Sequence, residues 1–162
     1  MRTLVFILFV ITVLATALGF LLTNPRITTK TVLIPAPLIT VWTTVTDHAS
    51  QPEWRTSLES VEEDLDAGRW TETPKQGPSI TFQEKERQPM RLYEIEIVSE
   101  GGFSGYSTLE FVEEGDETRV TMKEVSNVPN IYRRLLAYAF YNQSEQMDSY
   151  LRDLEQAVST DK

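Results

Sequence analysis

The side chains best suited to proton transfer are few and scattered along the chain. His48 is the single histidine, and histidine is the only residue type whose ordinary pKa lies near neutral pH. It follows Asp47 in a turn-rich stretch, so the pattern favours an exposed loop histidine, with Asp47 ending a helix or forming a turn. The chain has no cysteine, which excludes disulfides, thiol nucleophiles and zinc–thiolate sites. No cluster of metal ligands stands out in the sequence, and no metal or cofactor is expected.

Carboxylates on the candidate strands are more numerous. Four of them fall on the polar phase, where a solvated face is expected: Glu94, Glu96, Glu110 and Glu114. Three continue the apolar phase near strand ends, where fraying into solvent is expected: Glu84, Glu86 and Glu113. Acid–base catalysis by paired carboxylates needs one raised pKa, and no spacing here predicts one.

Tyrosines and arginines after Pro129 could serve a polar ligand. Tyr132, Tyr138 and Tyr141 either hydrogen-bond a carbonyl ligand or pack as amphipathic residues at an edge. Arg133 and Arg134 either face an anionic headgroup near the mouth of a cavity or are surface charges. These alternatives stay open at the level of sequence.

An apolar segment near the N-terminus predicts where the protein resides. Leu4–Leu22 contains no charge, and a helix of that length matches the roughly 30 Å hydrocarbon core of a bilayer. We therefore predict an uncleaved, single-pass membrane anchor over residues 1–25. A cleaved signal peptide, with its cleavage site at Ala15–Ala17, and a buried core helix are the alternatives. The short segment before the anchor favours a cytoplasmic N-terminus, with the soluble domain outside the cytoplasm.

Residues 26–162 have the length of one globular domain. The chain carries a net charge of −9, which argues against nucleic-acid binding and against electrostatic adhesion to anionic lipids. Solubility is the simplest meaning of this acidity.

Hydrophobic periodicity divides this domain into three parts. Thr28–Ile34 is typical of a strand, and Leu38, Val41, Trp42 and Val45 have the spacing of a short helix. A period of two then predicts six strands, with an antiparallel arrangement in which one face is packed. These strands are Leu58–Leu65, Trp70–Pro74, Ser79–Glu86, Met90–Ser99, Tyr106–Glu114 and Thr118–Val125. Gly101-Gly102 is read as a turn, and the period becomes helical from Ile131 to Val158.

This order of elements resembles the helix-grip fold of the START-like superfamily, also called SRPBCC. The segment VLIPAPLITVWTTVTDHASQPEW resembles the opening pattern of that family, and the segment YLRDLEQAV resembles the end of its closing helix. The resemblance covers about Thr28 to Val158. It implies an α+β fold in which a curved antiparallel sheet of about seven strands wraps around a long C-terminal helix, here with an added N-terminal transmembrane helix.

The resemblance also implies a cavity between sheet and helix that takes an apolar or amphipathic ligand. Aromatic residues and methionines of this sequence that could line it are Tyr93, Phe103, Tyr106, Phe111, Met122, Tyr138, Phe140, Tyr141 and Met147. Ordinary core packing is the alternative for each of them.

Together these features predict a membrane-anchored module that binds a hydrophobic small molecule or lipid. The lack of a convergent acid–base set makes an enzyme less favoured. A cyclase- or dehydratase-like enzyme would use Tyr, Glu or Asp residues of the cavity. A domain that grips a partner protein, with no small ligand, is a further alternative.

Overall fold

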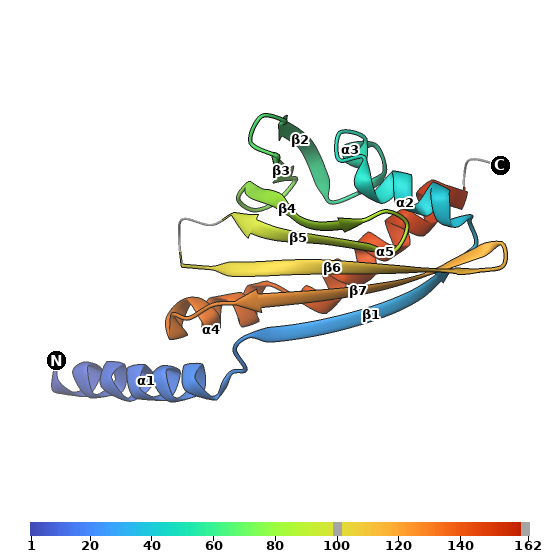
Figure 1. The fold of residues 1–162 in the computed structure, drawn as a ribbon. Coiled ribbons are helices and arrows are strands. Elements are labelled where there is room, and N and C mark those ends of the chain that lie inside the picture. Colours follow the sequence, from blue (N-terminus) through green and yellow to red (C-terminus); the bar gives the residue numbers. More distant parts are fainter. Residues whose placement is uncertain (99–101, 160–162) are drawn as a thin grey trace.

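A seven-stranded sheet with helices on one side forms the body of the computed structural model, which describes residues 1–98 and 102–159 (Figure 1). The helices are α1 (Arg2–Leu21), α2 (Leu38–Thr46), α3 (Gln51–Trp54), α4 (Ile131–Phe140) and α5 (Gln143–Ser159). The strands are β1 (Arg26–Ile34), β2 (Leu58–Asp64), β3 (Arg69–Pro74), β4 (Ile80–Gln88), β5 (Leu92–Val98), β6 (Ser104–Glu114) and β7 (Glu117–Asn127).

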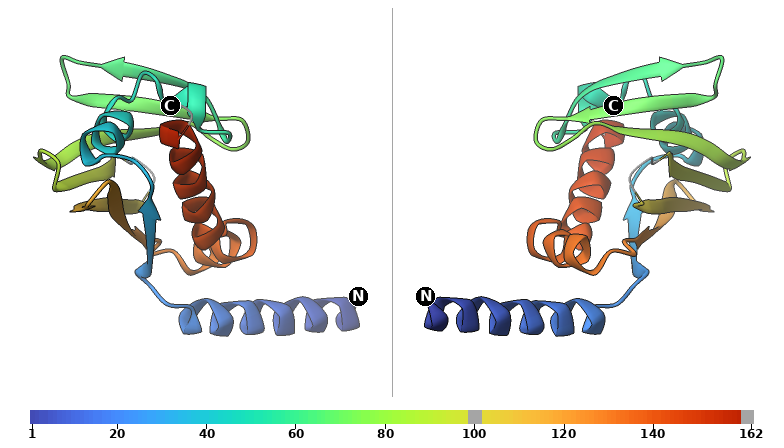
Figure 2. Two further views of the ribbon diagram at one scale, coloured as in Figure 1. Left: turned by 90° about the vertical axis from the view of Figure 1, so that its right-hand side faces the viewer. Right: turned by 90° about the vertical axis from the view of Figure 1, so that its left-hand side faces the viewer.

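The sheet is antiparallel throughout, in the order β1-β7-β6-β5-β4-β3-β2. β1 pairs with β7 from Arg26 opposite Ser126 to Ile34 opposite Thr118, so the first strand of the domain closes onto the last. The sheet curves around α5, which lies along its concave face (Figure 2). The predicted helix-grip architecture is confirmed.

The strand bounds agree with the sequence pattern to within a few residues. The predicted end of β5 at Ser99 and the turn residue Gly101 lie outside the described residues. In β4 an irregularity falls at Lys85, between the pairs Glu84–Ile95 and Glu86–Glu94. The extra residue shifts the alternation of side chains along β4 by one position. Glu84 therefore lies on the concave face and Glu86 on the convex face.

The core forms where α2 and α5 meet the concave face. Trp42 of α2 makes edge-on ring contacts with Tyr93 (6.1 Å between centroids) and Phe111 (5.3 Å). α5 contributes Leu151 and Leu154, which are 5% and 0% exposed. Each fully buried side chain of this size contributes roughly 1.5–3 kcal/mol to stability.

The C-terminal helix is not continuous, in contrast to the single helix predicted for Ile131–Val158. α4 ends at Phe140, because Tyr141 adopts an extended backbone (φ −120°, ψ 106°). The Asn142 side chain then accepts a hydrogen bond from the backbone N–H of Glu145 at 3.3 Å. Asn is a strong N-cap, so Asn142 begins a new helix at this point.

α1 lies outside the domain, and in the described residues it is the one helix long and apolar enough to cross a membrane (Figure 1). Its most apolar 18-residue window has a mean hydropathy of 2.8, and only 6% of that window is buried. This exposure excludes the buried core helix among the three alternatives. An anchor and a signal sequence remain consistent with it.

Asp153 of α5 ties the helix to the loop before β2. It is 6% exposed and accepts hydrogen bonds from the backbone N–H and the hydroxyl of Thr56 at 2.7 and 2.8 Å. Asp153→Ala removes the buried acceptor of both hydrogen bonds, so we expect a loss of about 2 kcal/mol in the free energy of unfolding. Denaturation of the full chain in a neutral detergent measures it.

Asp148→Ala is the matched control, since Asp148 pairs with Lys30 at 2.8 Å from a half-exposed position on the same helix. It should cost less than about 1 kcal/mol. Equal losses for the two variants would contradict the role assigned to Asp153.

Candidate functional site

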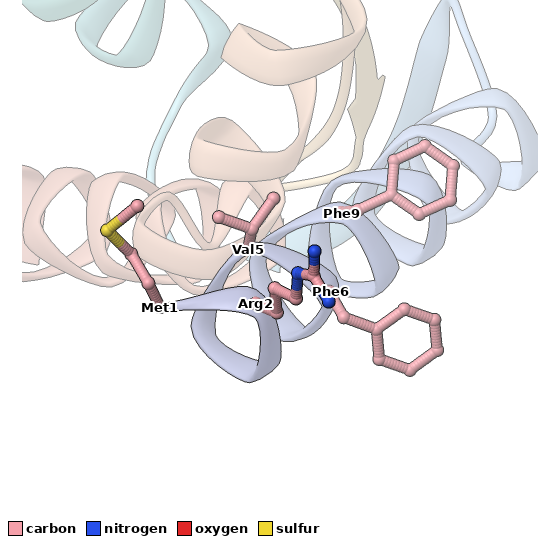
Figure 3. A pocket seen from close by; sticks show the side chains of 5 residues that line it. All are labelled: Met1, Arg2, Val5, Phe6 and Phe9. Carbon is pink, nitrogen blue, oxygen red and sulfur yellow. The ribbon is translucent and has the colours of Figure 1, made fainter.

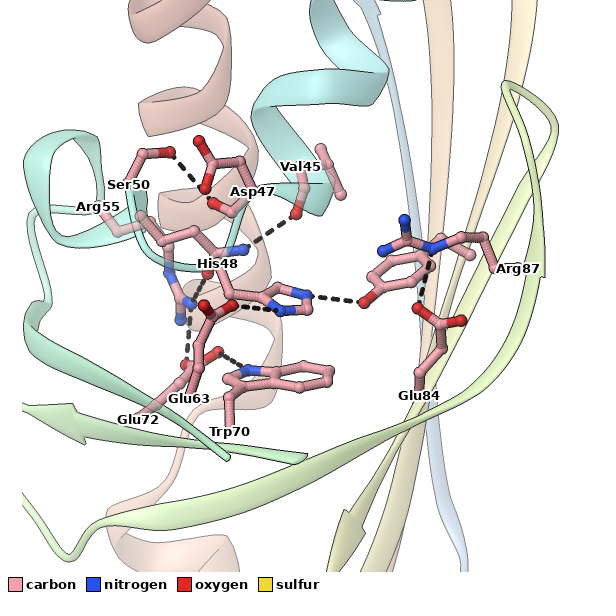
Figure 4. Close-up of polar contacts among 12 residues, drawn as sticks. Val45, Asp47, His48, Ser50, Arg55, Glu63, Trp70, Glu72, Glu84 and Arg87 are labelled. Carbon is pink, nitrogen blue, oxygen red and sulfur yellow. Dashed lines mark hydrogen bonds and ion pairs between the residues drawn. The ribbon is translucent and has the colours of Figure 1, made fainter. Parts of the chain in front are cut away.

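His48 lies at the rim of the concave face, in the loop after α2 (Figure 4). Its ring stacks on Trp70 of β3 with 3.7 Å between centroids, and its Nε2 lies 2.7 Å from the Tyr93 hydroxyl of β5. His48 is only 9% exposed, so the expected exposed loop histidine is wrong. The turn context of the sequence did not show that β3 and β5 close over this loop.

Burial keeps the His48 imidazole neutral. Desolvation, helped by the nearby Arg87 guanidinium, lowers the pKa of His48 to about 4. Burial raises the pKa of Tyr93 to about 12, so the phenol keeps its proton. Glu63 Oε1 lies 3.5 Å from Nδ1 and can only accept when ionised. We therefore assign the proton to Nδ1, and Nε2 accepts the hydrogen bond from Tyr93.

A second set of contacts fixes this rim. Arg55 pairs with Glu72 at 2.8 Å and donates to the Gln51 amide oxygen at 2.6 Å. Trp70 Nε1 donates to Glu72 at 3.3 Å, and Gln51 donates to the Val45 carbonyl at 3.0 Å (Figure 4). The Glu72 carboxylate thus fixes both Arg55 and the Trp70 ring on which His48 stacks.

A hollow of about 310 Å³ opens beside His48. It is lined by Thr46, His48, Glu63, Asp64, Leu65, Gly68, Arg69, Trp70, Glu84 and Arg87. The bulge at Lys85 brings both Glu84 and Arg87 to this side of the sheet, where they pair at 2.8 Å. A neutral imidazole–phenol pair can recognise a polar group here, but a base with a pKa near 4 accepts protons poorly at neutral pH.

A second polar cluster lies on the concave face, at the end where α4 and α5 join. Glu124 of β7 accepts a hydrogen bond from the Tyr141 hydroxyl at 3.2 Å, and Gln143 donates to the Glu124 backbone carbonyl at 3.0 Å. Arg26 donates to the Tyr141 carbonyl at 3.1 Å. Ser107 stands opposite Glu124 in the β6–β7 register, with a buried hydroxyl that has no hydrogen-bond partner.

Glu124 has the acid–base properties that His48 lacks. Burial raises the pKa of Glu124 to about 7, against the hydrogen bond from Tyr141 and the charge of Arg26, which both lower it. Burial and the adjacent Glu124 raise the pKa of Tyr141. Glu124 was not among the residues predicted from sequence, although a signal was present: Val120, Met122 and Glu124 are spaced two residues apart and therefore share one face of β7.

Four of the nine predicted cavity residues meet in the core. Tyr93, Phe111, Met122 and Met147 belong to one packed cluster and are between 1% and 9% exposed. They fill the space between the sheet and α5 in this structure. The hollow beside His48 lies at the rim of that space.

The other five lie elsewhere. Tyr106 lies an odd number of residues from Leu109 and Phe111 along β6, so it points to the opposite, convex face. There its ring centroid lies 4.9 Å from the Lys85 ammonium nitrogen. Phe103 is half-buried just before β6, and Phe140 is 84% exposed at the end of α4. Tyr141 contacts Glu124, as described above. Tyr138 donates to the Thr23 carbonyl at 2.8 Å, beside the end of α1.

Arg134 is not a surface charge, and its contacts differ from both alternatives considered from sequence. Its guanidinium donates to the carbonyls of Gly19 and Leu22 at 3.2 and 3.3 Å, and also to the backbone of Val128 and Pro129. It therefore satisfies carbonyl groups at the C-terminal end of α1.

A hollow of about 400 Å³ also lies beside the first turns of α1 (Figure 3). Its lining residues, Met1, Arg2, Val5, Phe6 and Phe9, all belong to this single exposed helix. Such a surface lacks the opposing walls of a binding cleft.

The profile of one protein family, described as polyketide cyclase / dehydrase and lipid transport, matches residues 26–158. No curated protein matches the chain.

Several solved structures share the fold. A START superfamily protein from Mycobacterium smegmatis is 16% identical with a TM-score of 0.66, over 83% of this chain and 97% of that one. The ZhuI aromatase/cyclase from Streptomyces sp. R1128 is 13% identical with a TM-score of 0.66, over 83% and 93%. A norcoclaurine synthase from Thalictrum flavum is 13% identical with a TM-score of 0.67, over 86% and 98%.

Proposed function

Since the chain belongs to the polyketide cyclase / dehydrase and lipid transport family, we propose that it is a membrane-anchored module, residues 1–25 forming the anchor and residues 26–162 the binding domain. The ligand is an apolar or amphipathic small molecule, held between the sheet and α5. Removal of its apolar surface from water, at roughly 25 cal/mol per Å², drives binding.

The observation that carries this proposal is the position of the polar cluster relative to α1. Glu124 and Tyr141 lie at the end of the concave face where α4 meets α5, and α4 packs directly against α1. A ligand dissolved in the bilayer therefore meets this end of the domain first. Because Met122 and Met147 fill the space beyond it, entry requires Tyr141 and the first turn of α5 to move away from the sheet.

Photocrosslinking tests this proposal on the full chain in liposomes. With a diazirine derivative of palmitic acid as the probe, we expect labelled peptides from β7 and from the start of α5, in addition to α1. Ser107→Phe places a ring on the concave face beside Glu124 and should reduce labelling of β7. Thr108→Phe, one residue further on the same strand, faces the convex side and should leave it unchanged.

Near-UV circular dichroism of both variants checks that the domain stays folded, since overpacking at a buried position costs roughly 1–3 kcal/mol. Labels restricted to α1 in the wild type would contradict the binding proposal. So would equal labelling of β7 in the two variants.

A cyclase- or dehydratase-like enzyme is the second candidate, favoured by the half-buried Glu124 with its pKa near 7 and by the unpartnered hydroxyl of Ser107 on the same face. A carboxyl of this pKa can both give and take a proton at neutral pH. Recovery of a chemically altered ligand from the wild type, and of the unaltered ligand from Glu124→Gln, would favour this candidate over simple binding.

A further inference from the structure

α4 carries an apolar stripe that the domain does not cover. Tyr132, Leu136 and Phe140 recur every four residues and are 49%, 59% and 84% exposed. A spacing of four places them on one side of the helix. α4 has no fully buried residue, so packing against the domain does not account for its amphipathic sequence.

α4 is also fixed to α1 by specific contacts. The hydroxyls of Thr16 and Tyr132 lie 3.0 Å apart. Gly19 lies so close to Ile131 that an added Cβ would come within 3.1 Å of its side chain and of its carbonyl oxygen. Together with the Arg134 guanidinium at the C-terminal end of α1, these contacts set the position of α4 along the axis of α1.

That position corresponds to a definite depth in a bilayer. α1 has 20 residues, a length of about 30 Å, which equals the hydrocarbon thickness. Thr16 lies five residues before the last residue of α1, or about 8 Å along its axis. Amphipathic helices at membrane surfaces lie about 5–10 Å deep, at the boundary of headgroups and acyl chains.

The residue types of α4 agree with that depth. Its charged residues are Arg133 and Arg134, and it contains no acidic residue, although the whole chain is acidic. Tyr132 and Tyr138 are aromatic residues with a polar tip, the kind enriched at membrane interfaces. The Arg134 guanidinium donates hydrogen bonds to carbonyls of α1, which the acyl chains of lipid cannot do.

We infer that α4 is an interfacial helix that lies in the bilayer beside α1, with Tyr132, Leu136 and Phe140 against the acyl chains. This inference rests on the proposed anchoring by α1. It assigns a lipid leaflet as the partner of the exposed stripe and places the α4–α5 junction at the membrane surface.

The absence of cysteine in the chain allows a direct test with single-cysteine variants. Leu136→Cys and Phe140→Cys report on α4, Leu14→Cys on α1, and Leu65→Cys on the exposed β2–β3 turn. Each full-length variant, labelled with the fluorophore NBD, is placed in phosphatidylcholine vesicles that contain acyl-chain doxyl quenchers. We expect loss of emission at positions 14, 136 and 140, and none at position 65.

The outcomes separate the inference from the anchoring on which it rests. Quenching at position 14 without quenching at 136 and 140 overturns the interfacial helix and leaves the anchor in place. No quenching at position 14 overturns both. A third outcome is that positions 136 and 140 are shielded from water but are not quenched, and that this shielding is lost when the protein is diluted in the membrane. A second copy of the chain then covers the stripe, which also overturns the inference.

Gly19→Leu gives a second, independent variant. The larger side chain must displace Ile131, because the Cβ alone is already in close contact. We expect reduced quenching at position 136 and unchanged quenching at position 14. Unchanged quenching at both positions would mean that α4 does not depend on its contact with α1, contrary to the inference.

Discussion

Glu124→Gln is expected to stabilise the domain at pH 8 by up to about 3 kcal/mol and to leave its stability unchanged near pH 4.5. The ordinary pKa of a glutamate is 4.5, and burial raises that of Glu124 to about 7. The folded state therefore holds this proton more tightly than the unfolded state. Wild-type stability must fall as the pH rises from 4.5 to 7, whereas Gln stays neutral throughout and keeps a carbonyl oxygen for the Tyr141 hydroxyl.

Urea denaturation of the full chain in a neutral detergent at several pH values measures this difference. Glu110→Gln is the matched control, because Glu110 is exposed on the convex side of β6, and it should change stability by less than about 0.5 kcal/mol at any pH. If the stability gain of Glu124→Gln were independent of pH, ionisation of this carboxyl would not be its cause.

His48 is expected to act in the opposite direction and to make the domain sensitive to acid. Its pKa falls from the ordinary 6.5 to about 4 on folding, so the folded state excludes a proton that the unfolded state binds. Stability is complete above pH 6.5 and is lost as the pH falls to 4, by up to about 3 kcal/mol. His48→Gln removes this slope, whatever the loss of the stacking on Trp70 does to the stability at pH 7.

NMR of histidine-labelled protein gives the pKa directly, since the chain has one histidine and its signal needs no assignment. Arg87→Gln removes the nearby guanidinium and should raise the pKa of His48 and narrow the acid-sensitive range. A wild-type imidazole that titrates near pH 6.5 would show that the ring is solvated, contrary to its position between Trp70 and Tyr93.

The two titrations overlap between pH 4.5 and 6.5, where Glu124 and His48 shift stability with opposite sign and similar size. Wild-type stability should therefore vary little over this range. In each single variant, the pH dependence of stability that remains comes from the other residue. Comparison of the two variants thus separates the contributions of the two ends of the concave face.

Much of the fold follows from local patterns in the sequence. Alternation in Leu109 and Phe111 and in Val120 and Met122 predicts paired strands with one packed face, because side-chain direction in a strand has a period of two. The helical spacing of Val41, Trp42 and Val45 likewise predicts α2. The break between α4 and α5 was missed, although Asn142 is a strong N-cap, because the apolar spacing runs on across it.

The polar sites were harder to predict, because they depend on residues far apart in sequence. His48 is buried by Trp70 and Tyr93, which lie 22 and 45 positions away, and no local pattern shows that contact. The pairing of Arg134 with Gly19 and Leu22 joins residues more than 110 positions apart. Glu124 is the exception, since its phase in β7 was readable from the sequence alone.

The pairing of β1 with β7 sets the order of events during synthesis. Arg26 can pair with Ser126 only after the 100 residues that follow Arg26 have been synthesised, and the sheet cannot close before then. At about 5–20 residues per second, translation of that interval takes roughly 5–20 s. Throughout it the first strand has its edge unpaired and its apolar residues, such as Ile34, uncovered. Nascent chains of this protein therefore need shielding until the last strand and α5 have been made.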